Sequence, residues 1–195
     1  MANLEPLIQS IPVAPLKLAS LEGCRTLADQ VNNYLVSFRH ESPTNVGQAD
    51  SLQGYCADSY LLECECPRFG SGEGKGVLKE SVRGCDLFIM VDVANYSLTY
   101  RVNGYENHMS PDNHYQDLKR IISAADGKAR RINVIMPFLY EGRQHKRSKR
   151  ESLDCALMLQ ELVDMGVSNI LTFDAHDPRV SNSIPLHGFD SFMPT

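Results

Sequence analysis

The chain has 195 residues, of which 43% are hydrophobic and 22% are charged, and its formal net charge is -5. That composition can fill the core of a globular domain, and it argues against a protein whose whole surface binds polyanions. No apolar run approaches the ~18 residues of a membrane span, so we expect no transmembrane helix. Residues 1–5 lack a basic segment before an apolar run, so we expect no signal peptide either.

Six cysteines are spaced in a way that gives little support to a zinc site. They stand at positions 24, 56, 64, 66, 85 and 155, with one Cys-x-Cys pair and no Cys-x-x-Cys pair. We expect reduced thiols that act as small core residues in a cytoplasmic protein, and we favour this over a metal site or disulfides.

The amino-terminal part predicts an extended segment, a strand and a helix. Residues 1–15 contain three prolines and are expected to form an extended lead-in, and 16–19 a short strand. Ser20 is expected to cap a helix whose apolar residues recur at helical spacing. These residues are Cys24, Leu27, Ala28, Val31, Tyr34 and Leu35.

The next segment predicts a loop and a hairpin. Residues 39–54 are polar and contain Ser, Pro, Asn and Gly, which is typical of a loop insertion. Residues 60–66 and 75–80 alternate enough to predict two strands, joined by a glycine-rich turn at 70–74.

Helices and strands alternate from residue 86 onward. Residues 86–92 predict a buried strand, and the pair Ser110-Pro111 predicts a helix start with a hydroxyl cap and proline in the first turn. Gly127 is expected to end that helix. Its predicted buried face consists of Tyr115, Leu118, Ile121, Ile122 and Ala125.

The carboxyl-terminal part continues the alternation. Residues 132–138 predict a strand, 152–165 a helix that stops at Gly166, and 169–173 a last strand. The helix is expected to bury Ala156, Leu159, Leu162 and Val163. Strands that alternate with helices indicate an α/β fold with a doubly wound, mainly parallel sheet.

Two polar motifs follow predicted strands and are the candidate site. Asp174 and His176 come directly after the last strand, two residues apart, so on an extended segment they point the same way. Residues 143–150 form the most basic stretch, with five Lys or Arg and one His, after the strand at 132–138. Both would leave the carboxyl edge of the sheet, where α/β proteins bind ligands. An acidic metal-type site beside a cationic loop suggests Mg-nucleotide chemistry, and Asp177 would add an acid for a hard cation.

Plainer interpretations stay open for both motifs. Asp174 and His176 could be a polar strand end with a hydrogen-bonded histidine. The basic stretch could be a solvated loop or a handle for RNA, although no aromatic residues interleave with it. The glycine turn before Lys75 is not a P-loop, because Phe69 and Gly76 occupy the positions that require Gly and Ser or Thr.

Several short motifs, in order and spacing, resemble one known family. They are RFGSGE at 68–73, SVRGCDLFI at 81–89, PDN at 111–113, RQ at 143–144 and DAHDP at 174–178. From about residue 67 to 189 the chain resembles the amino-terminal half of ribose-phosphate diphosphokinase, also called phosphoribosyl pyrophosphate synthetase. The resemblance implies a phosphoribosyltransferase-like α/β domain over 16–195, with a small β-hairpin extension. It also implies that a carboxyl-terminal domain, which binds ribose phosphate, is absent from this chain.

The resemblance implies a reaction and a cofactor. The β,γ-diphosphoryl group of Mg-ATP would be transferred to the C1 hydroxyl of ribose 5-phosphate, giving phosphoribosyl pyrophosphate and AMP, with Mg²⁺ as the metal. Arg143 and Gln144 would bind ATP. His176, with Asp174 beside it, would hold the metal on the triphosphate and take part in catalysis.

Further roles come from the same resemblance. The catalytic basic residues Lys146, Arg147 and Arg150 would close over the transferring group and neutralise developing charge. A second set would contact the adenine bound to a neighbouring subunit, which requires a homo-oligomer. This set is Phe69, Ser71 and Glu73. No nucleic-acid or membrane partner is implied.

The chain departs from the family pattern at three places. The family has an acid where this chain has His145, leucine where it has Ala175, and a second domain beyond the position of Thr195. We therefore expect negligible synthetase activity from these residues alone. The alternative hypotheses are a non-catalytic regulatory or scaffold subunit related to the enzyme, and nucleic-acid binding through the basic loop.

Overall fold

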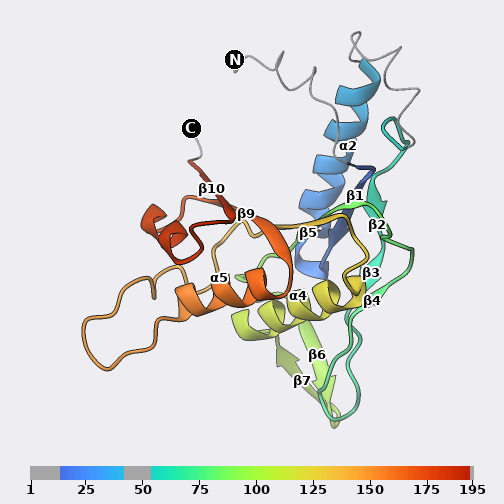
Figure 1. The fold of residues 1–195 in the computed structure, drawn as a ribbon. Helices are drawn as coiled ribbons and strands as arrows, with labels where there is room; N and C mark the ends of the chain where they lie inside the picture. Colours follow the sequence, from blue (N-terminus) through green and yellow to red (C-terminus); the bar gives the residue numbers. More distant parts are fainter. Residues whose placement is uncertain (1–13, 42–53, 194–195) are drawn as a thin grey trace.

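The computed structural model describes residues 14–41 and 54–193. Its centre is a six-stranded sheet with the order β10-β9-β8-β5-β1-β2, in which every pair of neighbours is parallel (Figure 1). The strands are β1 (Leu16–Ser20), β2 (Leu61–Leu62), β5 (Asp86–Met90), β8 (Arg131–Ile135), β9 (Val167–Phe173) and β10 (Gly188–Phe192). The predicted parallel α/β sheet is confirmed, and β10 is a strand that the sequence did not indicate.

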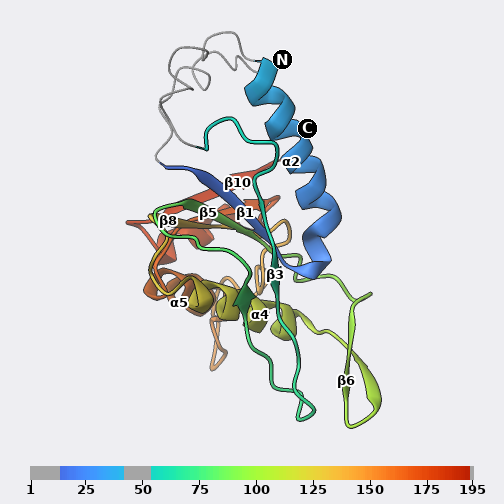
Figure 2. The ribbon, with the colours of Figure 1, turned by 90° about the vertical axis from the view of Figure 1, so that its right-hand side faces the viewer.

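Helices cover both faces of the sheet, as a doubly wound fold requires. Figure 2 shows α2 (Arg25–Glu41) on one face and both α4 (Pro111–Ala125) and α5 (Asp154–Asp164) on the other. The larger core lies beneath α4 and α5 and includes Leu87, Ile89, Leu118, Ile121, Val134, Leu159, Leu162 and Ile170. A smaller core beneath α2 contains Leu18, Cys24, Ala28 and Met90.

The start of α2 differs from the prediction. Ser20 is the last residue of β1, and its hydroxyl donates to the carbonyl of Leu21, so it does not cap the helix. The chain stays paired with the sheet one residue further, because the Leu21 N–H donates to the Met90 carbonyl, and a 3-10 helix at Glu22–Cys24 then leads into α2.

The predicted apolar stripe of α2 is only partly buried. Cys24 and Ala28 lie in the core, whereas Leu27 is 37% and Tyr34 63% exposed. Asn32 is buried instead, where its side-chain oxygen accepts the backbone N–H of Tyr60 at 2.8 Å. The spacing of hydrophobic residues does not predict a buried polar residue such as Asn32.

Two of the predicted boundary segments extend beyond the described residues. The lead-in at 1–15 falls mainly on 1–13, which lie outside them. In the predicted loop insertion at 39–54, residues 39–41 continue α2, and 42–53 lie outside the described residues.

The predicted hairpin is present but shorter. The segment 60–66 divides between β2 of the main sheet and β3 (Cys64–Glu65), which pairs antiparallel with β4 (Val77–Leu78). Gly76 lets this hairpin lie against α4, since a Cβ there would stand 2.4 Å from the Arg120 carbonyl oxygen.

A second hairpin was not predicted. It consists of β6 (Thr99–Val102) and β7 (Tyr105–His108), between β5 and α4. Asn103 and Gly104 form its turn with φ of 50° and 84°. An Asn-Gly pair with positive φ at both residues is the preferred two-residue hairpin turn, so the signal was present in the sequence.

The start and face of α4 are confirmed, and α5 is partly so. The hydroxyl of Ser110 accepts the Asn113 N–H at 3.2 Å, and all five predicted core residues of α4 are buried. In α5, Leu159 and Leu162 are buried as predicted, whereas Ala156 and Val163 are half-buried. Cys155 and Met158 fill the core beside them.

All six cysteines are free thiols. Cys24, Cys64, Cys85 and Cys155 are buried as predicted, Cys66 is half-buried, and Cys56 is exposed. Burial raises the pKa of both Cys64 and Cys155 to about 11, which keeps these thiols neutral in the core. Across 14–41 and 54–193, no helix combines the length and the apolar character needed to cross a membrane.

Candidate functional site

A cavity of about 270 Å³ lies at the carboxyl ends of β8 and β9. Leu139, Gly142 and Arg143, which follow β8, line one side, and residues 173–176 at the end of β9 line the other. Because β8 and β9 are neighbours in the sheet, two motifs that are distant in sequence meet here. The structure thus brings Arg143, Asp174 and His176 to one cavity, at the sheet edge where the sequence analysis placed them.

The turn that carries Asp174 is held by the edge strand β10. Asp174 has a φ of 48°, a left-handed conformation that Asp tolerates better than most residues. Its N–H donates to the Phe192 carbonyl at 2.9 Å, and the Ala175 N–H donates to the Ser191 hydroxyl at 3.0 Å. β10 therefore defines the turn from which Asp174 and His176 project, and Ala175 itself is buried.

His145 joins the two sides of the site. Its ring centroid lies 5.1 Å from that of His176. Its Nδ1 is 3.2 Å from the Arg143 carbonyl oxygen, which can only accept, so Nδ1 carries the proton of this bond. Its Nε2 lies 3.4 Å from Oδ2 of Asp177. The position where the resemblance implies an acid thus holds an imidazole in contact with His176.

Asp177 forms an ion pair with Arg179. The guanidinium donates to both carboxylate oxygens, with the shortest contact at 2.6 Å, and the Arg179 N–H also donates at 2.9 Å. These hydrogen bonds hold the pKa of the Asp177 carboxyl well below its usual range. In the structure Asp177 is therefore paired with Arg179 and is not the unpaired acid that the sequence analysis expected.

The basic loop after Arg143 is anchored at its base and exposed beyond it. The Gln144 side-chain N–H donates to the Ser152 carbonyl at 2.7 Å, and the Gln144 carbonyl accepts the Cys155 N–H at the start of α5. In Figure 1 the loop projects from the body of the molecule beside α5. Four cationic side chains of the loop are exposed and form no ion pair within the described part of the chain: Lys146, Arg147, Lys149 and Arg150.

The predicted adenine-contacting residues lie elsewhere. Phe69, Ser71 and Glu73 form the turn at the tip of the segment between β3 and β4, which Figure 1 shows at the opposite side of the molecule from the basic loop. Phe69 is 53% exposed, and the Ser71 hydroxyl donates to Glu73 at 2.8 Å. Within one copy of the chain, the structure does not bring these three residues to the cavity.

Asp174 and His176 are the side chains at this cavity that could hold a metal. Both are exposed, and their side chains form no hydrogen bond or ion pair with any described residue. Within 14–41 and 54–193 there is no group of three or more His, Cys, Asp or Glu side chains arranged around a metal position. Such a sparse set fits Mg²⁺, which commonly takes one or two protein ligands and completes its shell with water and substrate phosphate.

Sequence reasoning missed the residues that shape the site. Ser191 and Phe192 of β10 support the Asp174 turn through hydrogen bonds, and Arg179 forms an ion pair with the Asp177 carboxylate. The two-residue spacing of Asp177 and Arg179 could have suggested a local pair. Nothing in the short segment 188–192 could have indicated that it pairs with β9.

Comparisons with known proteins give one family and one fold. The family model for the N-terminal domain of ribose phosphate pyrophosphokinase matches residues 16–166. Ribose-phosphate pyrophosphokinase of Corynebacterium ammoniagenes is 29% identical over 167 residues, which are 85% of this chain and 41% of that protein. The Bacillus caldolyticus enzyme of the same name is 30% identical over 122 residues, or 62% of this chain and 34% of that protein. The chain thus spans less than half the length of these relatives.

A solved structure supports the fold. The phosphoribosylpyrophosphate synthetase from Mycobacterium smegmatis superposes with a TM-score of 0.64 at 22% sequence identity. The match covers 92% of this chain and 48% of that one. At this identity the likeness concerns the fold alone.

Proposed function

This chain belongs to the family of the N-terminal domain of ribose phosphate pyrophosphokinase, and on that basis we propose that it is the ATP-binding part of such an enzyme. The reaction is the transfer of diphosphate from Mg-ATP to C1 of ribose 5-phosphate. The observation that carries the proposal is the cavity at the ends of β8 and β9, which Arg143 lines together with Asp174 and His176.

Arg143 and the basic loop supply the positive charge for the triphosphate. A guanidinium can bind phosphate oxygens through two parallel hydrogen bonds, and Arg143 is exposed at the cavity with no described partner. The loop side chains of Lys146, Arg147 and Arg150 are equally free to contact phosphate. Their role is to neutralise charge that develops on the transferring group.

Asp174 and His176 are the residues that would hold Mg²⁺, which supplies charge neutralisation on the triphosphate when bound. Gln144 would act as a positioning residue: its side-chain N–H donates to the Ser152 carbonyl, its own carbonyl accepts the Cys155 N–H, and both bonds fix the segment on which Arg143 lies. This positioning differs from the direct ATP contact that the resemblance implied for Gln144.

The remaining parts of the enzyme lie outside this cavity. Because Phe69, Ser71 and Glu73 lie apart from it in one copy, their proposed contact with adenine requires a second copy of the chain in a homo-oligomer. Ribose 5-phosphate would be bound mainly by a carboxyl-terminal domain of the kind found in the longer relatives. The free thiols accord with a cytoplasmic location.

The test is calorimetric titration of the chain with Mg-ATP. Loss of one charged hydrogen-bond donor or ligand is worth about 1.5–3 kcal/mol, so Arg143→Ala and His176→Ala should each weaken binding by about tenfold to a hundredfold. Arg130→Ala removes an exposed arginine away from the cavity and should leave the affinity unchanged. Unchanged affinity in both site variants would show that the site assignment is wrong. A wild-type chain that does not bind Mg-ATP would favour the regulatory or scaffold subunit.

A further inference from the structure

A second, larger cavity lies at the point where the strand order of the sheet reverses. From β1 the chain moves to β2 on one side, and later to β5, β8, β9 and β10 on the other. The cavity measures about 480 Å³ and is lined by residues that follow β1 and by residues that follow β5. In open α/β sheets the crevice outside the carboxyl ends of the strands at such a reversal is where ligands bind. The candidate site at β8 and β9 is not at this point.

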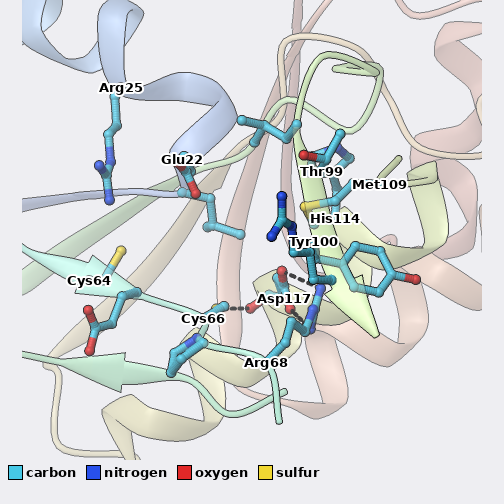
Figure 3. Close-up of a pocket in the computed structure, with 15 residues that line it drawn as sticks. Glu22, Arg25, Cys64, Cys66, Arg68, Thr99, Tyr100, Met109, His114 and Asp117 are labelled. Atoms are coloured by element: carbon cyan, nitrogen blue, oxygen red, sulfur yellow. Dashed lines mark hydrogen bonds and ion pairs between the residues drawn. The ribbon is translucent and has the colours of Figure 1, made fainter. Parts of the chain in front are cut away.

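The walls of this cavity are built from both hairpins and α4. Arg68, just after β3, makes two hydrogen bonds of 2.8 Å to the Asp117 carboxylate on α4. Its guanidinium also lies 5.3 Å from the ring centroid of Tyr100 in β6, which links the two hairpins. Because Arg68 and Asp117 pair with each other, they hold this wall of the cavity in place and are not free to bind a ligand (Figure 3).

His114 contributes a hydrogen-bond acceptor to the lining. The residue is 2% exposed, and its Nε2 lies 2.6 Å from the Asn95 carbonyl oxygen. Because a carbonyl only accepts, Nε2 carries the proton and Nδ1 of the neutral ring is an acceptor. Nδ1 has no hydrogen-bond partner within the described part of the chain.

Three charged side chains without a partner among the described residues line the cavity. Arg25 and Glu22 come from the chain after β1, and Figure 3 shows them across from Tyr100 and His114. Arg101 of β6 is a second lining arginine. The side chains of Arg25, Arg101 and Glu22 form no hydrogen bond or ion pair with any residue that the structure describes. Unpartnered guanidinium groups favour an anion, whereas Glu22 and the His114 acceptor favour hydrogen-bond donors.

We propose that this cavity binds a small organic anion that also carries hydroxyl or amino groups. Arg25 and Arg101 bind its phosphate or carboxylate group, and Glu22 and His114 accept hydrogen bonds from its donors. The volume falls within the range of about 300–1,000 Å³ that is typical of small-molecule sites. This site is separate from the proposed ATP site and does not depend on it.

The test is a titration of the ¹⁵N-labelled chain followed by NMR, which shows where each probe binds. The probes are glucose 6-phosphate for a phosphoester and malate for a hydroxycarboxylate, with glucose and inorganic phosphate as controls. We expect one of the two anionic probes to shift the amide signals of Glu22, Arg25 and Arg101 in a saturable way, and so to identify the anionic group. Glucose and inorganic phosphate should bind at least about tenfold more weakly, since each lacks half of the contacts.

Variants separate this site from the other one. The double substitution Arg25→Ala and Arg101→Ala should weaken binding by about tenfold or more, whereas Arg143→Ala and Arg130→Ala should leave it unchanged. Arg25 and Arg101 are both exposed. Because their loss removes no core packing, circular dichroism should show an intact fold in the double variant. The proposal is overturned if neither anionic probe shifts these signals at about 10 mM. Shifts confined to residues 138–143 and 173–176, equal binding of inorganic phosphate, or an unaffected double variant would overturn it too.

Discussion

Thr172 is a fully buried residue of β9 with an unpaired hydroxyl. It lies on the same face of the strand as Ile170, beneath α5, and its Oγ1 is the buried side-chain polar atom without a hydrogen-bond partner in the described part of the chain. A buried hydroxyl without a partner loses its hydration and regains nothing, which costs about 1–3 kcal/mol. The strand that carries the candidate site therefore contains a local destabilising group.

We predict that Thr172→Val raises the free energy of unfolding by about 1 kcal/mol, because valine has nearly the same shape and no hydroxyl. Urea unfolding followed by circular dichroism measures the change. Thr99→Val is the matched control, since the exposed Thr99 hydroxyl donates to Glu106 at 2.9 Å and its loss should bring no gain. A lower stability of Thr172→Val would mean that the hydroxyl is paired in solution.

His145 and Asp177 show how single residues change the chemistry of a shared motif. Asp177 belongs to the segment that resembles the family, yet Arg179 binds both of its oxygens. His145 stands where the resemblance implies an acid, and it contacts both Asp177 and the ring of His176. The site of this chain is therefore less acidic around His176 than the motif alone would indicate.

At the scale of elements, α4 is the helix whose boundaries follow most directly from local chemistry. Ser110 accepts hydrogen bonds from the backbone and side chain of Asn113, and Pro111 occupies the first turn. Asp126 then ends the helix with a φ of 50°, directly before Gly127. Both signals lie within a few residues of the ends they define, which is why the sequence predicted them.

We predict that Ser110→Ala lowers the free energy of unfolding by about 1 kcal/mol, the usual cost of losing a helix cap. Thermal or urea unfolding is the measurement. Ser123→Ala, at an exposed position in the last turn of the same helix, should leave stability unchanged or slightly raised. Equal effects of the two substitutions would argue against a capping role for Ser110.

The ends of strands and helices were less predictable where backbone groups pair with a strand that is distant in sequence. The β1 strand takes Ser20 because β5 continues alongside it, so the expected cap is lost to the sheet. The segment 60–66 changes partners after Leu62, from β1 to β4. Such pairings depend on the position of another strand, so the local pattern of hydrophobic residues does not predict them.

At the scale of the whole molecule, the two cavities lie at different points along the edge of the sheet. The proposed ATP cavity lies at β8 and β9, and the second cavity lies between β1 and β5. Residues proposed to bind adenine lie near neither the basic loop nor His176 within one copy. A complete synthetase site would therefore need both a second copy and the ribose-phosphate side of the longer relatives.

We predict that the purified 195-residue chain forms phosphoribosyl pyrophosphate at no more than a background rate. The reason is that the proposed residues cover the ATP side of the reaction, while the chain spans 41% of the Corynebacterium ammoniagenes relative. The assay is product formation from Mg-ATP and ribose 5-phosphate, with that full-length relative as the positive control. Sustained turnover by the chain alone would show that these residues also bind ribose 5-phosphate.

The sequence by itself determined the alternation of strands and helices, the buried face of α4 and the family motifs. These features rest on hydrophobic periodicity and turn chemistry within short windows, and they placed Arg143, Asp174 and His176 at strand ends. Only the tertiary structure decided that these three residues share a cavity, because that depends on β8 and β9 being neighbours. It also decided that β10 supports the Asp174 turn and that a second cavity lies where the strand order reverses. Long-range strand pairing creates both features, and no local pattern encodes it.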